Sequence, residues 1–267
     1  MGVLALKLVL APAFVVGASL TARRFGPRAG GLIGGLPVVG GPILLVLAIV
    51  HDGAFAERAA GASLLGLISL AGFVMAYGLL VRRTTWPPAL AAAWATFLGL
   101  TGIFALLTAG VHVAPTVGLA AACATFVAAR AVVPRPAAPS ADAAAPAAPP
   151  AWDLPVRAAC AAAMVLAISA ASAGLGPRVS GLLAPAPVIT SILAAFTHAQ
   201  LGPEATLRLL RGMLTGFFSF ALFCWTIAVA LPAAALGAAF ALGAVVAVLT
   251  QVAIAGGEAV GSRPYSA

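Results

Sequence analysis

The chain has 267 residues, of which 63% are hydrophobic and only 7% are charged, and its formal net charge is +8. A soluble domain carries about 25% charged residues because water must wet its surface, so this composition excludes a water-soluble globule. The basic residues come without interleaved aromatics or a nucleic-acid-binding motif. This argues against nucleic acid as a partner and indicates arginines at the ends of membrane helices.

Long apolar runs without charged residues predict nine membrane-spanning helices. A span needs about 20 apolar residues, and backbone groups in lipid must be satisfied within a helix. In chain order, the expected spans cover residues 3–21, 30–50, 60–81, 89–109, 113–133, 155–173, 180–200, 212–231 and 233–256. The expected fold class is therefore an all-α polytopic membrane protein.

An offset of 150 residues aligns the two halves of the sequence without a gap. Gly26-Pro27-Arg28 falls on Gly176-Pro177-Arg178, and positions 25–80 share 13 identities with positions 175–230. The offset predicts two copies of a four-span unit separated by one extra span. The predicted parts are a first unit at 1–110, a connecting span at 111–133, an Ala/Pro-rich linker at 134–153, a second unit at 154–257 and a tail at 258–267.

The number of crossings before the second unit is odd, so the two four-helix units are expected to have inverted topology, as in many secondary transporters. With the N-terminus outside, eleven of the 14 Lys and Arg residues lie on the cytoplasmic side, and Lys7, Arg58 and Arg178 lie outside. Because basic residues concentrate in cytoplasmic loops, we expect a bacterial inner-membrane protein with its N-terminus outside and its C-terminus in the cytoplasm.

Two pairs of arginines occur in both copies although the copies face opposite sides of the membrane. Arg28 matches Arg178, and Arg58 matches Arg208. The positive-inside preference acts in opposite directions on the two members of each pair, so their retention indicates a role within the unit. Two roles stay open: a structural one, in which the arginine caps a helix or holds a lipid phosphate, and contact of Arg28 and Arg178 with a substrate.

The second span of each unit contains helix breakers at matching positions, Pro37 and Pro187. Paired Gly/Pro-interrupted segments are a pointer to a transporter binding site, because a broken helix exposes N–H groups that attract anions. The alternative is that these residues only permit kinks and close packing. The candidate substrate-binding residues of the two segments are Gly34, Pro37, Gly40, Pro187, Thr190 and Ser191.

A basic residue also lies near the start of the first span of each unit, at Lys7 and Arg157. One interpretation is that its head group reaches the membrane interface. The other is that both residues point into the bundle and contact an anionic substrate. No buried carboxylate is expected beside them, because Asp142 and Asp153 belong to the linker and the other acidic residues lie in loops or at span ends.

The second half of the chain resembles the small GlpM-type bacterial inner-membrane proteins. The resemblance is carried by Arg157, Pro187 and the stretch from Gly202-Pro203-Glu204 to Arg208. Proteins of this type are single four-span units with a basic residue in the first span and a proline in the second. The resemblance implies a duplicated, fused unit of this kind, and it implies no substrate.

The sequence contains no HExxH or GxSxG motif and no paired carboxylates, and its three cysteines lack metal-ligand spacing. We therefore expect no enzyme activity, no metal and no other cofactor. The favoured function is alternating-access transport of an anionic small solute or lipid between inverted repeats, with membrane lipids as further partners. The alternative is an accessory or scaffold subunit without a transport site. Homo-oligomerisation stays open in both cases.

Overall fold

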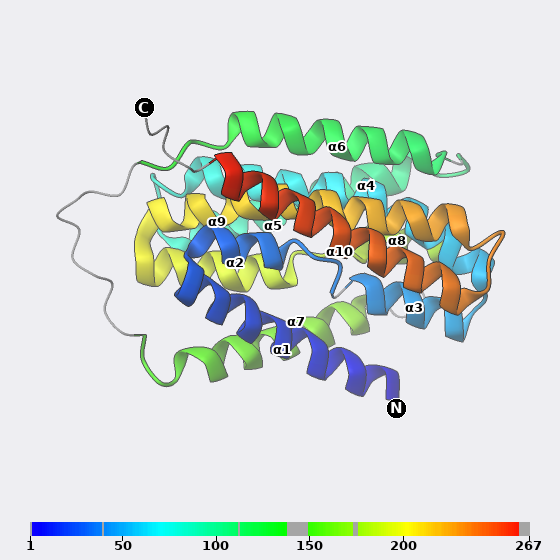
Figure 1. Ribbon diagram of the computed structural model, residues 1–267, viewed down its shortest axis with the longest axis horizontal. Helices are drawn as coiled ribbons and strands as arrows, with labels where there is room; N and C mark the ends of the chain where they lie inside the picture. Colours follow the sequence, from blue (N-terminus) through cyan, green and yellow to red (C-terminus); the bar gives the residue numbers. More distant parts are fainter. Residues whose placement is uncertain (1, 39, 112, 138–148, 173–175, 262–267) are drawn as a thin grey trace.

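The computed structural model describes residues 2–38, 40–111, 113–137, 149–172 and 176–261. Within these ranges the chain forms α-helices and no strand, which confirms the expected all-α class. The helices are α1 (Gly2–Phe25), α2 (Pro27–Gly34), α3 (Gly40–Val50), α4 (Gly53–Leu80), α5 (Trp86–Leu107), α6 (Pro115–Val132), α7 (Asp153–Ser172), α8 (Pro177–Leu183), α9 (Val188–Ala230) and α10 (Leu236–Gly261). Figure 1 shows them packed into one elongated bundle.

Five helical segments among the described residues are long and apolar enough to cross a membrane, as expected for a membrane protein. They are Gly53–Leu80, Trp86–Leu107, Pro115–Val132, Arg178–Ala230 and Leu236–Gly256. The segment Arg178–Ala230 has 53 residues and contains two of the expected spans. The total of nine spans and the duplication remain predictions.

Helix α9 folds back on itself at Gly202. This residue has a φ of 78°, a left-handed conformation that glycine tolerates, and Pro203 follows where a missing N–H costs little. Gly34 packs against both Leu193 and Met213, which would be about 30 Å apart along a straight helix. The two halves of α9 therefore lie beside each other (Figure 1).

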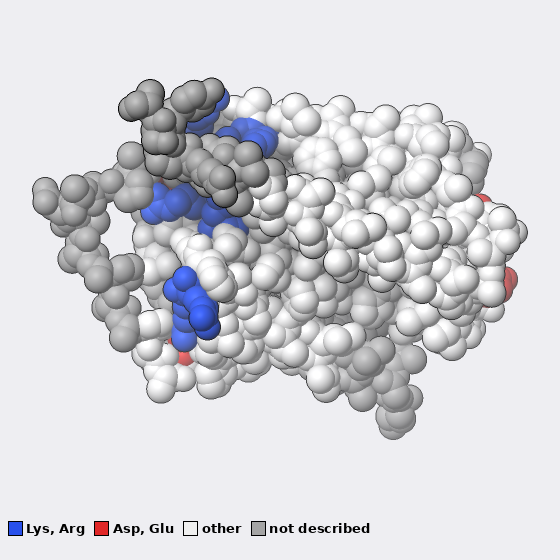
Figure 2. All heavy atoms as spheres, viewed as in Figure 1, with Lys and Arg blue, Asp and Glu red and all other residues white. Residues whose placement is uncertain are grey.

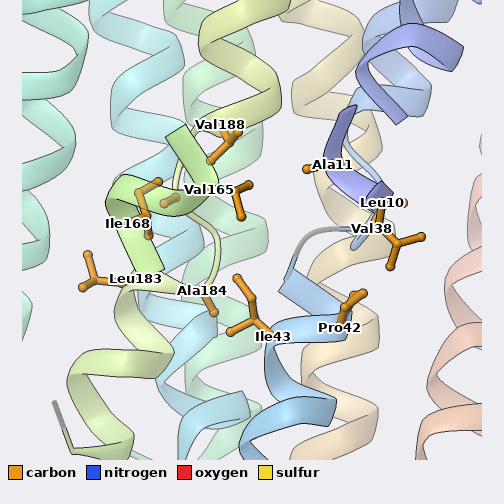
Figure 3. A pocket seen from close by; sticks show the side chains of 11 residues that line it. Leu10, Ala11, Val38, Pro42, Ile43, Val165, Ile168, Leu183, Ala184 and Val188 are labelled. Atoms are coloured by element: carbon orange, nitrogen blue, oxygen red, sulfur yellow. The ribbon is translucent and has the colours of Figure 1, made fainter. Parts of the chain in front are cut away.

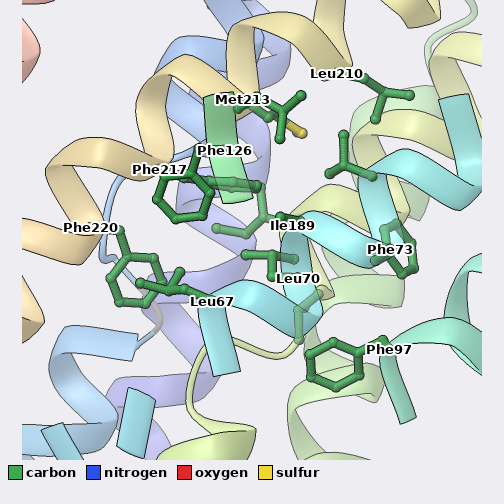
Figure 4. Packing of buried hydrophobic residues seen from close by; sticks show 14 of the residues in the cluster. Leu67, Leu70, Phe73, Phe97, Phe126, Ile189, Leu210, Met213, Phe217 and Phe220 are labelled. Carbon is green, nitrogen blue, oxygen red and sulfur yellow. The ribbon is translucent and has the colours of Figure 1, made fainter. Parts of the chain in front are cut away.

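Helices α4 and α9 form the centre of the bundle, and α5, α6 and α10 face outward. In the most apolar stretch of α4 72% of the residues are buried, compared with 17% in α5 and in α10 and 22% in α6. Aromatic side chains join these layers, because Phe73, Phe97, Phe126 and Phe217 come from α4, α5, α6 and α9 and are all buried. Figure 4 shows them around one continuous apolar core.

Both predicted helix breaks are present. Helix α2 ends at Gly34 and α3 begins at Gly40, while α8 ends at Leu183 and α9 begins at Val188. The backbone follows the same path in each: the N–H of Val38 donates to the carbonyl of Leu36 at 2.8 Å, and the N–H of Val188 donates to that of Ala186 at 2.7 Å. Pro37 and Pro187 lie inside these turns.

Each short helix beside a break packs on a long helix from the other half of the chain. Gly31 of α2 lies against the carbonyl of Leu209 in α9, and Gly181 of α8 lies against the carbonyl of Ala59 in α4. The two contacts correspond, because Gly31 and Gly181 are 150 positions apart, and so are Ala59 and Leu209. Since a Cβ at either glycine would strike backbone, these close crossings require small residues.

Basic side chains gather at one end of the bundle, here called the arginine-rich end. Figure 2 shows this concentration at the left of the view in Figure 1. The end comprises Arg23, Arg82, Arg130, Arg135, Arg157, Arg208 and Arg211, each of which takes part in a hydrogen bond at this end. Arg58 and Arg178 lie at the other end. The charge separation agrees with the expected topology, and the side that faces the cytoplasm remains a prediction.

Candidate functional site

The two breaks meet around a cavity of about 30 Å³, here called the central cavity. Eight of its lining residues form four pairs that are 150 positions apart: Gly34 and Ala184, Leu36 and Ala186, Gly40 and Thr190, and Leu70 and Phe220. The volume suits about one water molecule, so the centre is closed to a larger solute in this conformation.

The central cavity has one available hydroxyl group. The side chain of Thr190 is only 3% exposed, lines the cavity and has no hydrogen-bond partner among the described residues. The neighbouring Ser191 is occupied, because its Oγ accepts a hydrogen bond from Nε1 of Trp94 at 3.0 Å. Thr190 is therefore the hydroxyl that a ligand at the centre would meet.

A second, apolar crevice adjoins the breaks. It has a volume of about 20 Å³, and its lining comes from α1, α3, α7, α8 and both breaks. Figure 3 shows Val38 of the first break, Val188 at the start of α9, and Ile43 and Val165 around the crevice. The crevice offers no charged side chain, so it contributes packing and no anion-binding group.

Arg157 is held by a buried carboxylate at the arginine-rich end. Its Nε donates to Oδ2 of Asp153 at 2.9 Å, and Asp153 is fully buried at the start of α7. Arg23 and the amide of Gln200 also donate to this carboxylate, each at 2.5 Å. The expectation that Asp153 lies in the linker and that no buried carboxylate accompanies Arg157 was wrong. Helix α7 begins earlier than predicted because an acidic residue in its first turn is favoured by the helix dipole.

Asp153 precedes the expected span 155–173. Its environment stabilises the charged form of the carboxyl group. Burial raises the pKa of this carboxyl, but the hydrogen bonds from Gln200, Arg157 and Arg23 and the charge of Arg157 hold the pKa below its usual range. The guanidinium of Arg157 also lies over the ring of Phe196 at 4.6 Å. Arg157 is thus fully engaged inside the protein and is a poor candidate for direct contact with a solute.

The end of α6 is tied down at the arginine-rich end. Arg211 donates to the carbonyls of Arg130 and Val133, each at 2.8 Å, and Arg130 donates to the hydroxyl of Thr215. The polar side chains of α9 therefore hold the C-terminus of α6 against the bundle. These contacts fasten α6 to α9 at this end.

The other end contains a cavity of about 310 Å³, here called the end cavity. It lies between α4, α8 and the start of α6, and Glu57, Arg58, Thr108 and Arg178 provide its polar side chains. Nη1 of Arg178 donates to the carbonyl of Thr108 at 2.9 Å.

The structure distributes the predicted substrate-binding residues over three places. Gly34, Gly40 and Thr190 line the central cavity, beside Pro37, Pro187 and Ser191 in or next to the breaks. Arg157 lies at the arginine-rich end and Arg28 is in the first turn of α2, whereas Arg178 lines the end cavity. Lys7 belongs to α1, and its side chain lies outside the described part of the chain.

Several polar residues at the arginine-rich end were missed from the sequence, namely Ser19, Arg23, Asp153 and Gln200. One signal was present: Asp153 and Arg157 are four positions apart, a spacing that places two side chains on one helix face. Gln200 carries no such signal, since it reaches Arg157 only through the packing of α9 on α7.

No family model, no curated protein and no solved structure matches this chain. The resemblance to GlpM-type proteins therefore stays a prediction, and the functional argument rests on the geometry.

Proposed function

We propose that this protein is a membrane transporter built from two inverted repeats, and that it moves an anionic small solute or a lipid by alternating access at the crossing of its two broken helices. The observation that carries the proposal is the central cavity, whose lining contains four pairs of residues 150 positions apart. Inverted-repeat transporters place their substrate site at such an interface, between discontinuous helices.

The exchange of short helices between the halves supports this proposal. Glycine contacts pair α2 with α9 and α8 with α4, so each break is supported by the half of the chain to which it does not belong. Movement of one half against the other would shift both breaks together. A static scaffold has no requirement for two interrupted helices at its centre.

The different states of the two ends also support alternating access. The arginine-rich end is closed over α6 by hydrogen bonds, while the opposite end contains the end cavity. An alternating-access protein in one of its two states is open toward one side and closed toward the other. We infer that the present conformation is closed at the centre and at the arginine-rich end.

Cysteine accessibility tests the proposal against the scaffold alternative. Thr190→Cys is introduced after replacement of Cys123, Cys160 and Cys224, and membrane-impermeant thiol reagents are applied to right-side-out and inside-out vesicles. Transport predicts labelling of Thr190→Cys from both sides. Labelling from neither side, or from one side only, supports the scaffold.

The neighbouring residue gives a matched control. Ser191 lies one position along the same helix and is hydrogen-bonded to Trp94, away from the cavity lining. Ser191→Cys is therefore expected to react more slowly than Thr190→Cys from either side. Equal labelling rates at the two positions would mean that the reagent reaches α9 without regard to the cavity. This result would contradict a defined substrate path past Thr190.

A further inference from the structure

The end cavity has the size of a small-molecule site and lies outside the central cavity. Its volume of about 310 Å³ is within the range of ligand-binding pockets. It opens between α4, α8 and the α5–α6 connection, and two arginines from different helices line it.

Arg178 presents donors that the protein leaves partly unused. Its Nη1 donates to the carbonyl of Thr108, which fixes the direction of the guanidinium plane. Its Nε is buried and has no hydrogen-bond partner among the described residues. A buried donor without an acceptor is costly. Because protein atoms enclose Nε, a ligand in the cavity would meet the guanidinium through its Nη nitrogens.

Arg58 adds a second guanidinium to the same cavity. It is exposed and forms no hydrogen bond or ion pair with another described residue, although the adjacent Glu57 also lines the cavity. The formal charges of Arg58, Arg178 and Glu57 give the lining a net charge of +1. The cavity therefore favours an anion.

The equivalent arginines at the other end are used by the protein itself. Arg208, 150 positions after Arg58, donates to the carbonyl of Ala137 at 3.2 Å. Arg28, the counterpart of Arg178, also has a partner. Arg58 and Arg178, in contrast, both line the end cavity.

We propose that the end cavity binds a phosphate group held by Arg58 and Arg178. Guanidinium groups bind oxyanions through paired N–H donors, and a tetrahedral phosphate presents enough oxygens to meet two guanidiniums from different helices. The phosphate belongs either to a soluble phosphate compound or to an anionic lipid head group. As the substrate site of the transporter, the end cavity rests on the proposed function. Binding of phosphate to it can nevertheless be measured without any transport assay.

Binding to the purified full-length protein tests this site in two arms. In detergent, inorganic phosphate is titrated and followed by calorimetry. In lipid nanodiscs, native mass spectrometry compares the retention of phosphatidylglycerol with that of phosphatidylcholine. Arg58→Gln and Arg178→Gln are compared with Arg83→Gln. This control removes the same charge from an exposed arginine that lies just beyond the other end of α4.

We expect Arg58→Gln and Arg178→Gln to weaken binding of at least one probe about tenfold, the loss of a charged hydrogen bond, while Arg83→Gln leaves it unchanged. A loss confined to inorganic phosphate assigns the site to soluble anions, and one confined to phosphatidylglycerol assigns it to lipid. The proposal is overturned if neither probe binds, or if all three variants bind alike.

Arg58 is exposed, so its variant is expected to fold even if Arg178→Gln does not, and Arg58→Gln alone then decides the result. The outcome is separable from that of the transport proposal. Labelling of Thr190→Cys from both sides without phosphate binding would leave the transporter intact with another substrate. Phosphate binding without two-sided labelling would leave a binding protein that does not transport.

Discussion

The two ends of the bundle carry corresponding residues but have different structures. Arg208 and Arg58 are 150 positions apart, as are Arg28 and Arg178. At the arginine-rich end the side chains of α9 bind the C-terminus of α6. At the other end the matching arginines line a cavity beside the start of α6.

Two sequence differences between the halves accompany this difference in structure. Arg211 stands where the first half has Gly61, and Thr215 stands where it has Leu65. Arg211 and Thr215 make the contacts that tie down α6, whereas Gly61 and Leu65 line the end cavity. Corresponding positions of the two halves thus fasten α6 at one end and line a cavity at the other.

The largest effect is expected for Asp153→Asn, which affects only the arginine-rich end. The change leaves the buried guanidinium of Arg157 without its counter-charge, and breaking a buried ion pair costs about 3–5 kcal/mol. The free energy of unfolding in mixed micelles should fall by about that amount.

Glu57→Gln is the matched control for this variant. Glu57 lines the end cavity and has no ion-pair partner among the described residues, so its neutralisation should change the unfolding free energy by less than about 0.5 kcal/mol. Equal effects of the two variants would show that Arg157 does not depend on Asp153.

The double variant Arg211→Gly with Thr215→Leu gives the closed end the residues of the open end. It removes three hydrogen bonds that involve charged groups, and one such bond is worth about 1.5–3 kcal/mol. Because 1.4 kcal/mol corresponds to a factor of ten, labelling of Thr190→Cys from the arginine-rich side should become at least about tenfold faster. An unchanged labelling rate from that side would show that these contacts do not limit access to Thr190.

Enlarging the glycine at the helix crossing of α2 or of α8 should destabilise the protein by the same amount in both halves. Gly31→Ala and Gly181→Ala each push a methyl group against a backbone carbonyl, and overpacking of this kind costs about 1–3 kcal/mol. A Cβ at Gly99 of α5 meets nothing within 4 Å, so Gly99→Ala should be neutral or slightly stabilising. Thermal unfolding of the three variants compares them, and unequal losses at positions 31 and 181 would argue against equivalent crossings.

The smallest expected effect near neutral pH is the effect of protonating Asp153 on the free energy of unfolding. Its folded pKa lies below the ordinary value of 3.8, so its stabilising contribution is present above pH 3.8 and is lost as the pH falls through the folded value. The stability difference between the wild type and Asp153→Asn should stay constant from pH 7 to about pH 5 and then shrink toward acid. A difference that grows on acidification would contradict the direction of the shift.

The sequence predicted the features that depend on local chemistry. Low charge and long apolar runs predicted an all-helical membrane protein. Proline and glycine predicted both breaks, since proline removes a backbone donor and glycine loosens a helix. Pro37 and Pro187 therefore marked the place where Gly34, Gly40 and Thr190 meet.

The features that were missed depend on tertiary contacts. The partners of Arg157 could not be predicted, because Gln200 and Ser19 come beside it only when α9 and α1 pack on α7. Likewise, nothing in the local sequence of Arg58 and Arg178 distinguishes them from Arg208 and Arg28. The two ends differ in the contacts of Arg211 and Thr215 with α6, which are tertiary contacts.

The central claim is that the two halves are inverted copies, and the sidedness of one matched pair of loop positions tests it most directly. Thr85 and Ala235 are 150 positions apart, are both exposed and directly precede α5 and α10. Single cysteines at these positions in a cysteine-free background are labelled with an impermeant reagent in intact cells. The account predicts that Ala235→Cys reacts from outside and that Thr85→Cys reacts only after the membrane is opened. Labelling of both positions from the same side would mean that the halves are parallel, which contradicts the account.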